Sequence, residues 1–298
     1  MPQPFPFVLN VISPEAAALA GPLRAVAAEH GAAAGEIAWL APERAFDVPF
    51  FDHSDAVLMV ARATAAQIAA DINVVPAANR RKKLLIADMD STIINCECLD
   101  ELADMAGLKE KVAPITEAAM RGELEFEPAL RARAALLKEL PISALERVYT
   151  ERVRLNPGAE ALVATMRAHG ARTMLVSSGF TYFTRAIAKE CGFDSEQANE
   201  LLQEDGKFTG LVAEPILGRD AKLRALEKAV AEFDISFEDV IAVGDGANDL
   251  AMIQRAGLGV AWHAKPILAN AADAMIAHAD LTSLLYLQGY RKNEIVRA

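Results

Sequence analysis

The sequence predicts an α/β protein with a doubly wound parallel sheet, joined at its N-terminus to a small α+β domain. From residue 84 onward, short apolar runs alternate with helical stretches, which is the pattern of a parallel sheet. Between about residues 97 and 154 no strand is evident, so a helical cap is expected to interrupt the sheet after its first strand. Before residue 80, strands and helices follow a different order.

Residues 1–80 are expected to form a separate ferredoxin-like domain. The expected order is strand, helix, strand, strand, helix, strand, which suits a small sandwich of helices on a sheet. The strands are expected at residues 5–12, 36–40, 55–60 and 72–75, and the helices at residues 14–33 and 63–71. A polar linker at residues 76–79 and the basic cluster after it mark the boundary with the second domain, residues 81–298.

The second domain carries the predicted parallel sheet. Its strands are expected at residues 84–88, 172–177, 240–243, 258–261 and 274–276. A helical insertion directly after the first of them would sit over the carboxyl ends of the strands, where a lid belongs. A small hairpin is expected at residues 201–212, with Asp205-Gly206 as its turn.

Composition narrows the class of protein. The 298 residues are 53% hydrophobic, enough to bury a sizeable core. No apolar run approaches the ~20 residues of a membrane span, and the N-terminus lacks a secretory signal, so we expect a cytoplasmic protein with no membrane partner. Three cysteines do not make a disulfide framework. A net charge of −11 argues against nucleic acid as a partner.

Two carboxylates, Asp88 and Asp90, follow the first apolar strand of the larger domain. The carboxyl ends of parallel strands are where ligands bind in open α/β sheets. Carboxylates crowded there repel each other, and a divalent cation such as magnesium would relieve the repulsion. With a phosphate substrate, one carboxylate could attack phosphorus while the other handles protons. The alternative is an ordinary turn, which Asp and Ser also favour.

Three later segments carry polar groups near strand ends or helix starts. Ser177-Ser178-Gly179 offers a hydroxyl and backbone N–H groups for a phosphate, although an ordinary helix cap is the alternative. Lys222 could neutralise a phosphoryl oxygen, or it could be a solvated surface lysine. Asp245 lies between glycines that permit a close backbone approach, and Asp249 follows four residues later. Asp245 is the metal ligand that this third strand end suggests.

These segments, in chain order, resemble the four motifs of the haloacid dehalogenase superfamily of phosphatases over about residues 84–280. The resemblance implies a haloacid dehalogenase-like core. It implies Asp88 as the nucleophile that forms an aspartyl phosphate, and Asp90 as general acid and base. It further implies Mg²⁺ held by Asp88, the backbone carbonyl of Asp90 and Asp245, with Asp249 supporting these ligands. The phosphate-binding residues that it implies are Ser177, Ser178, Gly179, Lys222 and Asn248.

The expected cap suggests the substrate. The apolar stripe of one cap helix consists of Phe126, Leu130, Ala134 and Leu137. Arg133 falls on the same stripe, whereas Arg131 points elsewhere. An inward arginine needs an anion, and its fork fits a carboxylate, although snorkelling along the cap surface is the alternative. Glu97 and Arg133 also match what phosphoserine-hydrolysing members of the superfamily use to hold amino and carboxylate groups, and Phe126 is similar to their cap aromatic.

The resemblance therefore implies magnesium-dependent hydrolysis of phosphoserine, the last step of serine biosynthesis. Two alternatives stay open: the substrate could be another small phosphomonoester, or the reaction could be phosphotransfer instead of hydrolysis. Met89, Ser178 and Pro114 depart from the pattern; Pro114 is expected to interrupt a cap helix. Residues 1–80 resemble ACT-like regulatory folds, so they could be a serine sensor, a dimerisation module that would make a homodimer, or a passive appendage.

Overall fold

A computed structural model describes residues 5–52, 55–120 and 123–296. The chain divides into two compact units. The first consists of Met1–Leu85, Pro157–Thr173 and Ile235–Ala298, and the second consists of Ile86–Asn156 and Met174–Asp234. None of the helices within the described ranges is long and apolar enough to cross a membrane.

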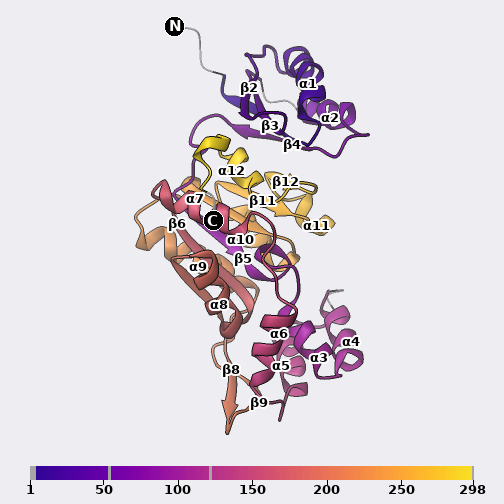
Figure 1. Cartoon of the computed structure of the whole chain (residues 1–298), viewed down its shortest axis with the longest axis vertical. Coiled ribbons are helices and arrows are strands. Elements are labelled where there is room, and N and C mark those ends of the chain that lie inside the picture. The colour runs from indigo at the N-terminus through magenta and orange to yellow at the C-terminus, as the bar shows by residue number, and fades with distance from the viewer. Residues whose placement is uncertain (1–4, 53–54, 121–122, 297–298) are drawn as a thin grey trace. The chain divides into compact units, whose positions relative to one another are not determined.

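The N-terminal part of the first unit is a four-stranded antiparallel sheet with the strand order β2-β3-β1-β4. Its strands are β1 (Phe7–Ile12), β2 (Ala38–Ala41), β3 (Ala45–Phe50) and β4 (Asp71–Pro76). The helices α1 (Ala16–His30) and α2 (Asp55–Thr64) lie together on one side of this sheet (Figure 1). Leu23, Phe46 and Val57 are among the buried side chains that join the two layers.

Two of the elements expected in this region are wrong. Residues 55–60, expected as a strand, begin helix α2, and the expected helix at residues 63–71 contains only the end of α2 and a turn. A short apolar run cannot by itself distinguish a strand from a buried helix face, and here Val57 and Ala61, four residues apart, point into the core. The true strand, β3, contains Pro49, which argues against a strand in sequence. Pro49 lies beyond Asp47, the last residue of β3 that pairs with β2.

The central sheet has six strands in the order β12-β11-β10-β5-β6-β7. The strands are β5 (Leu84–Asp88), β6 (Arg172–Phe180), β7 (Ser195–Asn199), β10 (Val240–Gly244), β11 (Leu258–Trp262) and β12 (Ala274–Ile276). The pairs β10·β11, β11·β12 and β6·β7 are parallel. The predicted doubly wound sheet is therefore confirmed, and β7 is the strand that the sequence did not reveal. Its residues, Ser-Glu-Gln-Ala-Asn, form an edge strand without an apolar run.

Helices follow most of these strands. They are α7 (Ala159–Ala168), α8 (Thr181–Cys191), α9 (Arg219–Glu232), α10 (Leu250–Arg255), α11 (Pro266–Ala269) and α12 (Ser283–Leu287). Helices α8 and α9 both begin close to residues that were predicted from the sequence to bind phosphate. Helix α8 starts directly after residues 177–179, and Lys222 lies in the first turns of α9.

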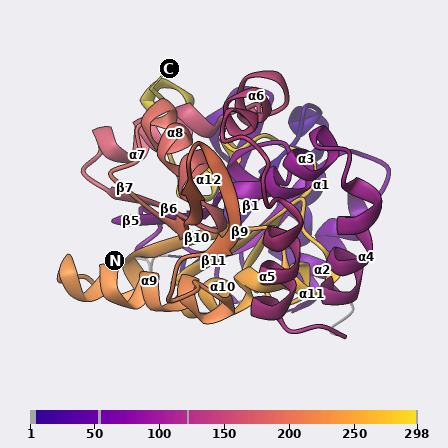
Figure 2. The ribbon, with the colours of Figure 1, turned by 90° about the horizontal axis from the view of Figure 1, so that it is seen from below.

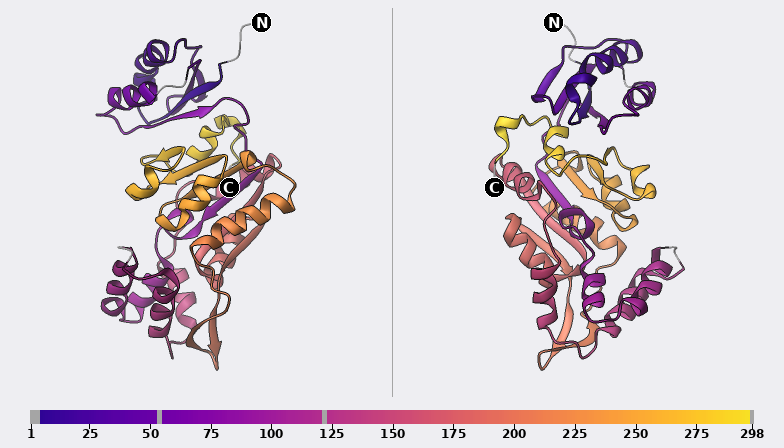
Figure 3. Two further views of the ribbon diagram at one scale, coloured as in Figure 1. Left: turned by 180° about the vertical axis from the view of Figure 1, so that it is seen from behind. Right: turned by 45° about the vertical axis from the view of Figure 1, so that its right-hand side comes forward.

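The predicted helical insertion is present in the second unit and forms the cap (Figure 3). Its helices are α3 (Cys98–Met105), α4 (Lys109–Met120), α5 (Phe126–Leu136) and α6 (Ser143–Glu151). Helix α4 continues on both sides of Pro114, so the expectation that this proline interrupts a helix is wrong.

The expected hairpin is formed by β8 (Leu201–Glu204) and β9 (Lys207–Val212). Asp205 and Gly206 both have positive φ, +48° and +76°, as a tight hairpin turn requires. Strand β9 lies against α5 of the cap (Figure 2). Backbone hydrogen bonds join the hairpin to the end of that helix and the following loop: Glu139 N donates to Phe208 O and Ile142 N to Gly206 O, each at 3.0 Å.

Candidate active site

Asp88, the last residue of β5, forms a buried ion pair with Lys222. Lys222 Nζ lies 2.6 Å from Asp88 Oδ1, and the same oxygen accepts a hydrogen bond from Met89 N at 2.8 Å. Lys222 is only 1% exposed and Asp88 4%, so the alternative of a solvated surface lysine is wrong. A buried ammonium is tolerated only when it is paired. The pair therefore fixes the Asp88 carboxylate at the carboxyl end of the sheet.

Asp90 lies two residues further on and is held from two sides. Its Oδ1 accepts a hydrogen bond from Cys98 N at 2.9 Å, and its Oδ2 accepts one from Ser177 Oγ at 3.0 Å. Burial raises the pKa of the Asp90 carboxyl, and the hydrogen bonds from Cys98 and Ser177 and the charge of Lys222 only partly oppose that shift. A carboxyl that retains its proton beside a carboxylate can act as a general acid.

Gly179 makes room for this arrangement. Its N–H donates to Ser177 Oγ at 2.8 Å. A Cβ at this position would lie 2.9 Å from Asp90 Oδ2 and 3.0 Å from Ser177 Oγ. Any side chain there would crowd the Asp90 carboxyl and the Ser177 hydroxyl, so glycine is needed for the close approach of these groups.

Asn199 supports the site and was missed in the sequence. Its side chain donates to Ser178 O at 2.9 Å and accepts from Leu217 N at 2.7 Å. It thereby fastens the end of β6 to the segment that precedes α9 and Lys222. Nothing in the local pattern reveals this role, because Asn199 ends a polar edge strand and its partners are distant in sequence.

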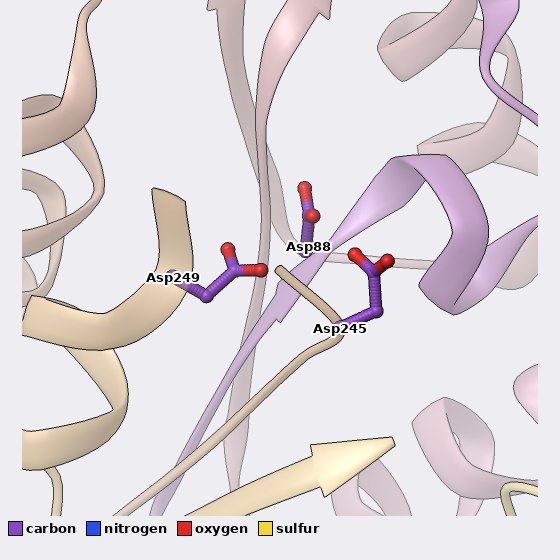
Figure 4. Close-up of side chains that lie close together, drawn as sticks. All are labelled: Asp88, Asp245 and Asp249. Carbon is purple, nitrogen blue, oxygen red and sulfur yellow. The ribbon is translucent and has the colours of Figure 1, made fainter. Parts of the chain in front are cut away.

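A carboxylate cluster forms where Asp88 meets two acids of the 244–249 segment. Asp88, Asp245 and Asp249 each offer an oxygen, and these atoms all lie within 4.8 Å of one another (Figure 4). Asp249 is fully buried, and its Oδ2 accepts a hydrogen bond from Gly246 N at 3.1 Å. Three carboxylates at this spacing repel one another unless a cation lies among them, and oxygen ligands suit a hard divalent ion. The residues fit a divalent metal site.

Glycines allow the chain to close around these acids. A Cβ at Gly244 would lie 2.4 Å from Asp249 Oδ2, and one at Gly246 would lie 2.5 Å from Asn248 Oδ1. Asn248 therefore lies directly beside the backbone of this turn. The tight loop predicted from the glycines is present, and it brings the two acids together.

The cap places Glu97 and Arg133 in the same unit as Asp90. Glu97 precedes α3, and its Oε1 accepts a hydrogen bond from Ser91 Oγ at 2.8 Å. Arg133 lies in the last turn of α5, and its Nη1 lies 3.4 Å from Thr116 Oγ1. Burial lowers the pKa of the Arg133 guanidinium, while the charges of Asp100, Glu97 and Asp90 oppose the shift.

The neighbouring cap residues follow the predicted helix faces. Leu130, Ala134 and Leu137 are buried. Arg131 points away from them and forms an ion pair with Glu214 at 2.6 Å. Phe126, at the start of α5, lies beside Gly218, where a Cβ would be 3.6 Å from its ring. Gly218 precedes α9, so Phe126 lies close to the helix that carries Lys222.

A family model described as haloacid dehalogenase-like hydrolase matches residues 85–254. The chain belongs to this family. A phosphoserine phosphatase of Archaeoglobus fulgidus is 45% identical over 206 residues, which are 69% of this chain and 60% of that protein. A phosphoserine phosphatase of Polaromonas is 47% identical over 210 residues, covering 69% of this chain and 89% of that protein.

The chain is also similar in structure to a phospho-aspartyl intermediate analogue of phosphoserine phosphatase. The two chains are 43% identical, and the TM-score is 0.65. The match covers 69% of this chain and 98% of that one. The chain spans less than two thirds of the length of the Archaeoglobus relative.

Two departures from the family pattern are accommodated inside this core. Met89, the first residue that we expected to depart from the pattern, is completely buried. Ser178 contributes its carbonyl oxygen to the bond from Asn199 and remains half-buried. Neither change removes one of the groups that surround Asp88.

Proposed function

We propose that this chain hydrolyses L-phosphoserine to L-serine and phosphate through an aspartyl phosphate on Asp88. The observation that carries the proposal is the buried Asp88–Lys222 pair beside Asp90, a carboxyl with a raised pKa. A carboxylate paired with a lysine, beside a carboxyl whose pKa is raised, suits a division of work between a nucleophile and a general acid. The names of the relatives and the inward arginine of the cap support phosphoserine as the substrate.

In the first step, an Asp88 oxygen attacks phosphorus and the bond to the serine oxygen breaks. Asp90 gives its proton to that leaving oxygen. In the second step, Asp90, now a carboxylate, takes a proton from a water molecule that attacks phosphorus; the bond between the Asp88 oxygen and phosphorus breaks, which releases phosphate and restores both carboxyl groups. The hydrogen bonds from Cys98 N and Ser177 Oγ hold both Asp90 oxygens in place. Asp90 is thus restrained in orientation while its charge changes.

The surrounding groups stabilise the negative charge of the phosphoryl group in transfer. Lys222, Ser177, Gly179 and Asn248 are the residues that we assign to this role, with Ser178 contributing backbone. Asp88 and Asp245 would hold a magnesium ion, with the Asp90 carbonyl as a third ligand and Asp249 fixing the arrangement. When bound, the ion neutralises charge on the phosphoryl oxygens.

The cap recognises the amino-acid end of the substrate. Arg133 pairs with the carboxylate in a bidentate geometry, and Glu97 accepts hydrogen bonds from the ammonium group. Phe126 closes the site on its apolar side. A substrate without the carboxylate loses the Arg133 contact and retains the others.

The proposal is tested by phosphate release from L-phosphoserine, D-phosphoserine, phosphothreonine, phosphoethanolamine and an aryl phosphate, each with Mg²⁺ and with a chelator. We expect magnesium-dependent turnover with a strong preference for L-phosphoserine. Magnesium-dependent release from the other esters, with phosphoserine poor, would retain the Asp88 chemistry and overturn the substrate. Transfer of the phosphoryl group to an added alcohol, in place of release, would indicate a phosphotransferase.

A further inference from the structure

Two polar atoms inside the cap are buried and accept or donate no hydrogen bond among the described residues. They are Arg133 Nε and Asp100 Oδ1. Buried polar atoms are paired in the great majority of cases, so each exception calls for an explanation. These two belong to side chains of opposite charge, from α5 and α3 respectively.

The Nε group of Arg133, which has no hydrogen-bond partner among the described residues, lies on an edge of the guanidinium that can bind a carboxylate. Nη1 is engaged by Thr116 Oγ1 at 3.4 Å, whereas Nε shares its edge of the guanidinium with Nη2. A carboxylate accepts two parallel hydrogen bonds from such an edge. Thr116 therefore contacts Nη1, while Nε has no hydrogen-bond partner among the described residues.

A guanidinium in this position still needs a counter-charge when no substrate is bound. Among the nearby acids, the charge of Asp100 does most to raise the pKa of the Arg133 guanidinium against the effect of burial, ahead of Glu97 and Asp90. Glu97 is engaged by Ser91, and Asp90 is engaged by Cys98 and Ser177. Asp100 is the acid near Arg133 for which the mechanism above has no use.

We propose that Asp100 is a positioning residue, whose carboxylate supplies the counter-charge that holds Arg133 inside the cap and leaves its Nε edge open for the substrate carboxylate. Because Asp100 balances the charge without occupying the Nε edge, the guanidinium is oriented before substrate arrives. Such pre-organisation reduces the free energy that binding must spend on ordering. This inference rests on the proposed function, since it assumes a substrate that carries a carboxylate.

A purely structural role for Asp100 has to be separated from this one. Asp100 lies in the first turn of α3, where any acid interacts favourably with the helix dipole. Glu101 occupies the same turn, and its Oε2 pairs with Arg152 at 2.9 Å. Replacement of Glu101 by Gln removes the same charge from the same helix end, so it is the matched control for Asp100→Asn.

The experiment measures kcat and KM of full-length wild type, Asp100→Asn, Glu101→Gln, Arg133→Met and the Asp100→Asn/Arg133→Met double variant. The substrates are L-phosphoserine and phosphoethanolamine, which lacks the carboxylate. We expect Asp100→Asn to raise the KM for L-phosphoserine by about tenfold with little change in kcat, and to leave phosphoethanolamine within about twofold. Glu101→Gln should leave kcat and KM unchanged for both substrates. In the Arg133→Met background, Asp100→Asn should add less than about twofold, because the residue through which it acts is gone.

Equal effects on the two substrates, or an additive effect in the Arg133→Met background, would overturn the inference, as would an unchanged KM. Should Asp100→Asn fail to fold, Asp100→Glu replaces it. That variant keeps the charge but moves the carboxylate, and we expect it to raise the KM for L-phosphoserine alone, by a smaller factor. Wild type that hydrolyses both esters equally well overturns the proposed substrate and this inference together. If the wild type is selective for L-phosphoserine but Asp100→Asn has an unchanged KM for it, only the inference about Asp100 is overturned.

Discussion

The reaction centre and the cap site are built in opposite ways. Around Asp88 and Asp90, the described side chains engage one another through a short ion pair and hydrogen bonds to both Asp90 oxygens. In the cap, Arg133 Nε and Asp100 Oδ1 lie buried without partners. Hydrogen bonds to both oxygens restrain the Asp90 carboxyl, whereas the buried Arg133 Nε has no partner among the described residues. We therefore expect variants of the two regions to affect chemistry and substrate specificity separately.

The largest effect is expected from Asp88→Asn. Loss of the nucleophile should lower kcat by about 10⁴-fold or more for every phosphomonoester, because the same attack is required whichever alcohol leaves. Steady-state phosphate release from L-phosphoserine and phosphoethanolamine measures it. Substantial activity in the pure variant would show that the nucleophile is another residue, and a loss confined to one ester would break the separation.

Lys222→Met should come next, with kcat lowered by about 10³-fold for both esters. It also leaves Asp88 buried without its partner, so we expect the free energy of unfolding to fall by about 3–5 kcal/mol in the presence of chelator. Urea unfolding measures that loss. Lys228→Met, on the exposed side of the same helix, is the control and should be neutral. A Lys222→Met protein as stable as this control would contradict the role of the ion pair.

Arg133→Met should affect the cap site alone. We expect kcat/KM for L-phosphoserine to fall by about 100-fold, and that for phosphoethanolamine to stay within a few fold, because only the first substrate carries a carboxylate. Arg131→Met is the control, since Arg131 pairs with Glu214 instead. Parallel losses on both substrates would mean that the cap arginine serves the chemistry, and the two sites would no longer be separable.

The smallest effect is expected from Gly179→Ala. A methyl group 2.9 Å from Asp90 Oδ2 should displace the general acid slightly and lower kcat by about tenfold. Gly21→Ala, in α1, meets nothing within 4 Å and should instead raise the free energy of unfolding by about 0.5–1 kcal/mol with no change in kcat. Full kcat in Gly179→Ala would show that Asp90 tolerates displacement.

The sequence predicted the reaction centre better than the cap. Strand β5 was placed at its observed bounds, because the apolar run is bounded by the basic residues 80–83 before it and by Asp88 at its end. Lys222 could be assigned only through family resemblance, since its burial depends on distant residues. Helix α2 was predicted as a strand because residues 56–60 form a continuous apolar run, and β3 was missed because it contains Pro49. Asn199 and Asp100 could not have been found, because an edge-strand amide and a first-turn acid are ordinary where they stand.

The attachment of the cap has a mechanical consequence. The chain enters and leaves the cap through two segments that pair with each other: Ile94 forms a bridge with Leu155, and Asn156 Nδ2 donates to Thr92 O at 2.8 Å. A cap joined to the rest of its unit only through these two paired segments would be free to rotate about them. The β8–β9 hairpin is hydrogen-bonded to the cap at Glu139 and Ile142 and provides a second attachment. Any rotation of the cap about these paired segments would therefore have to move the hairpin with it, or break the hydrogen bonds that join the two.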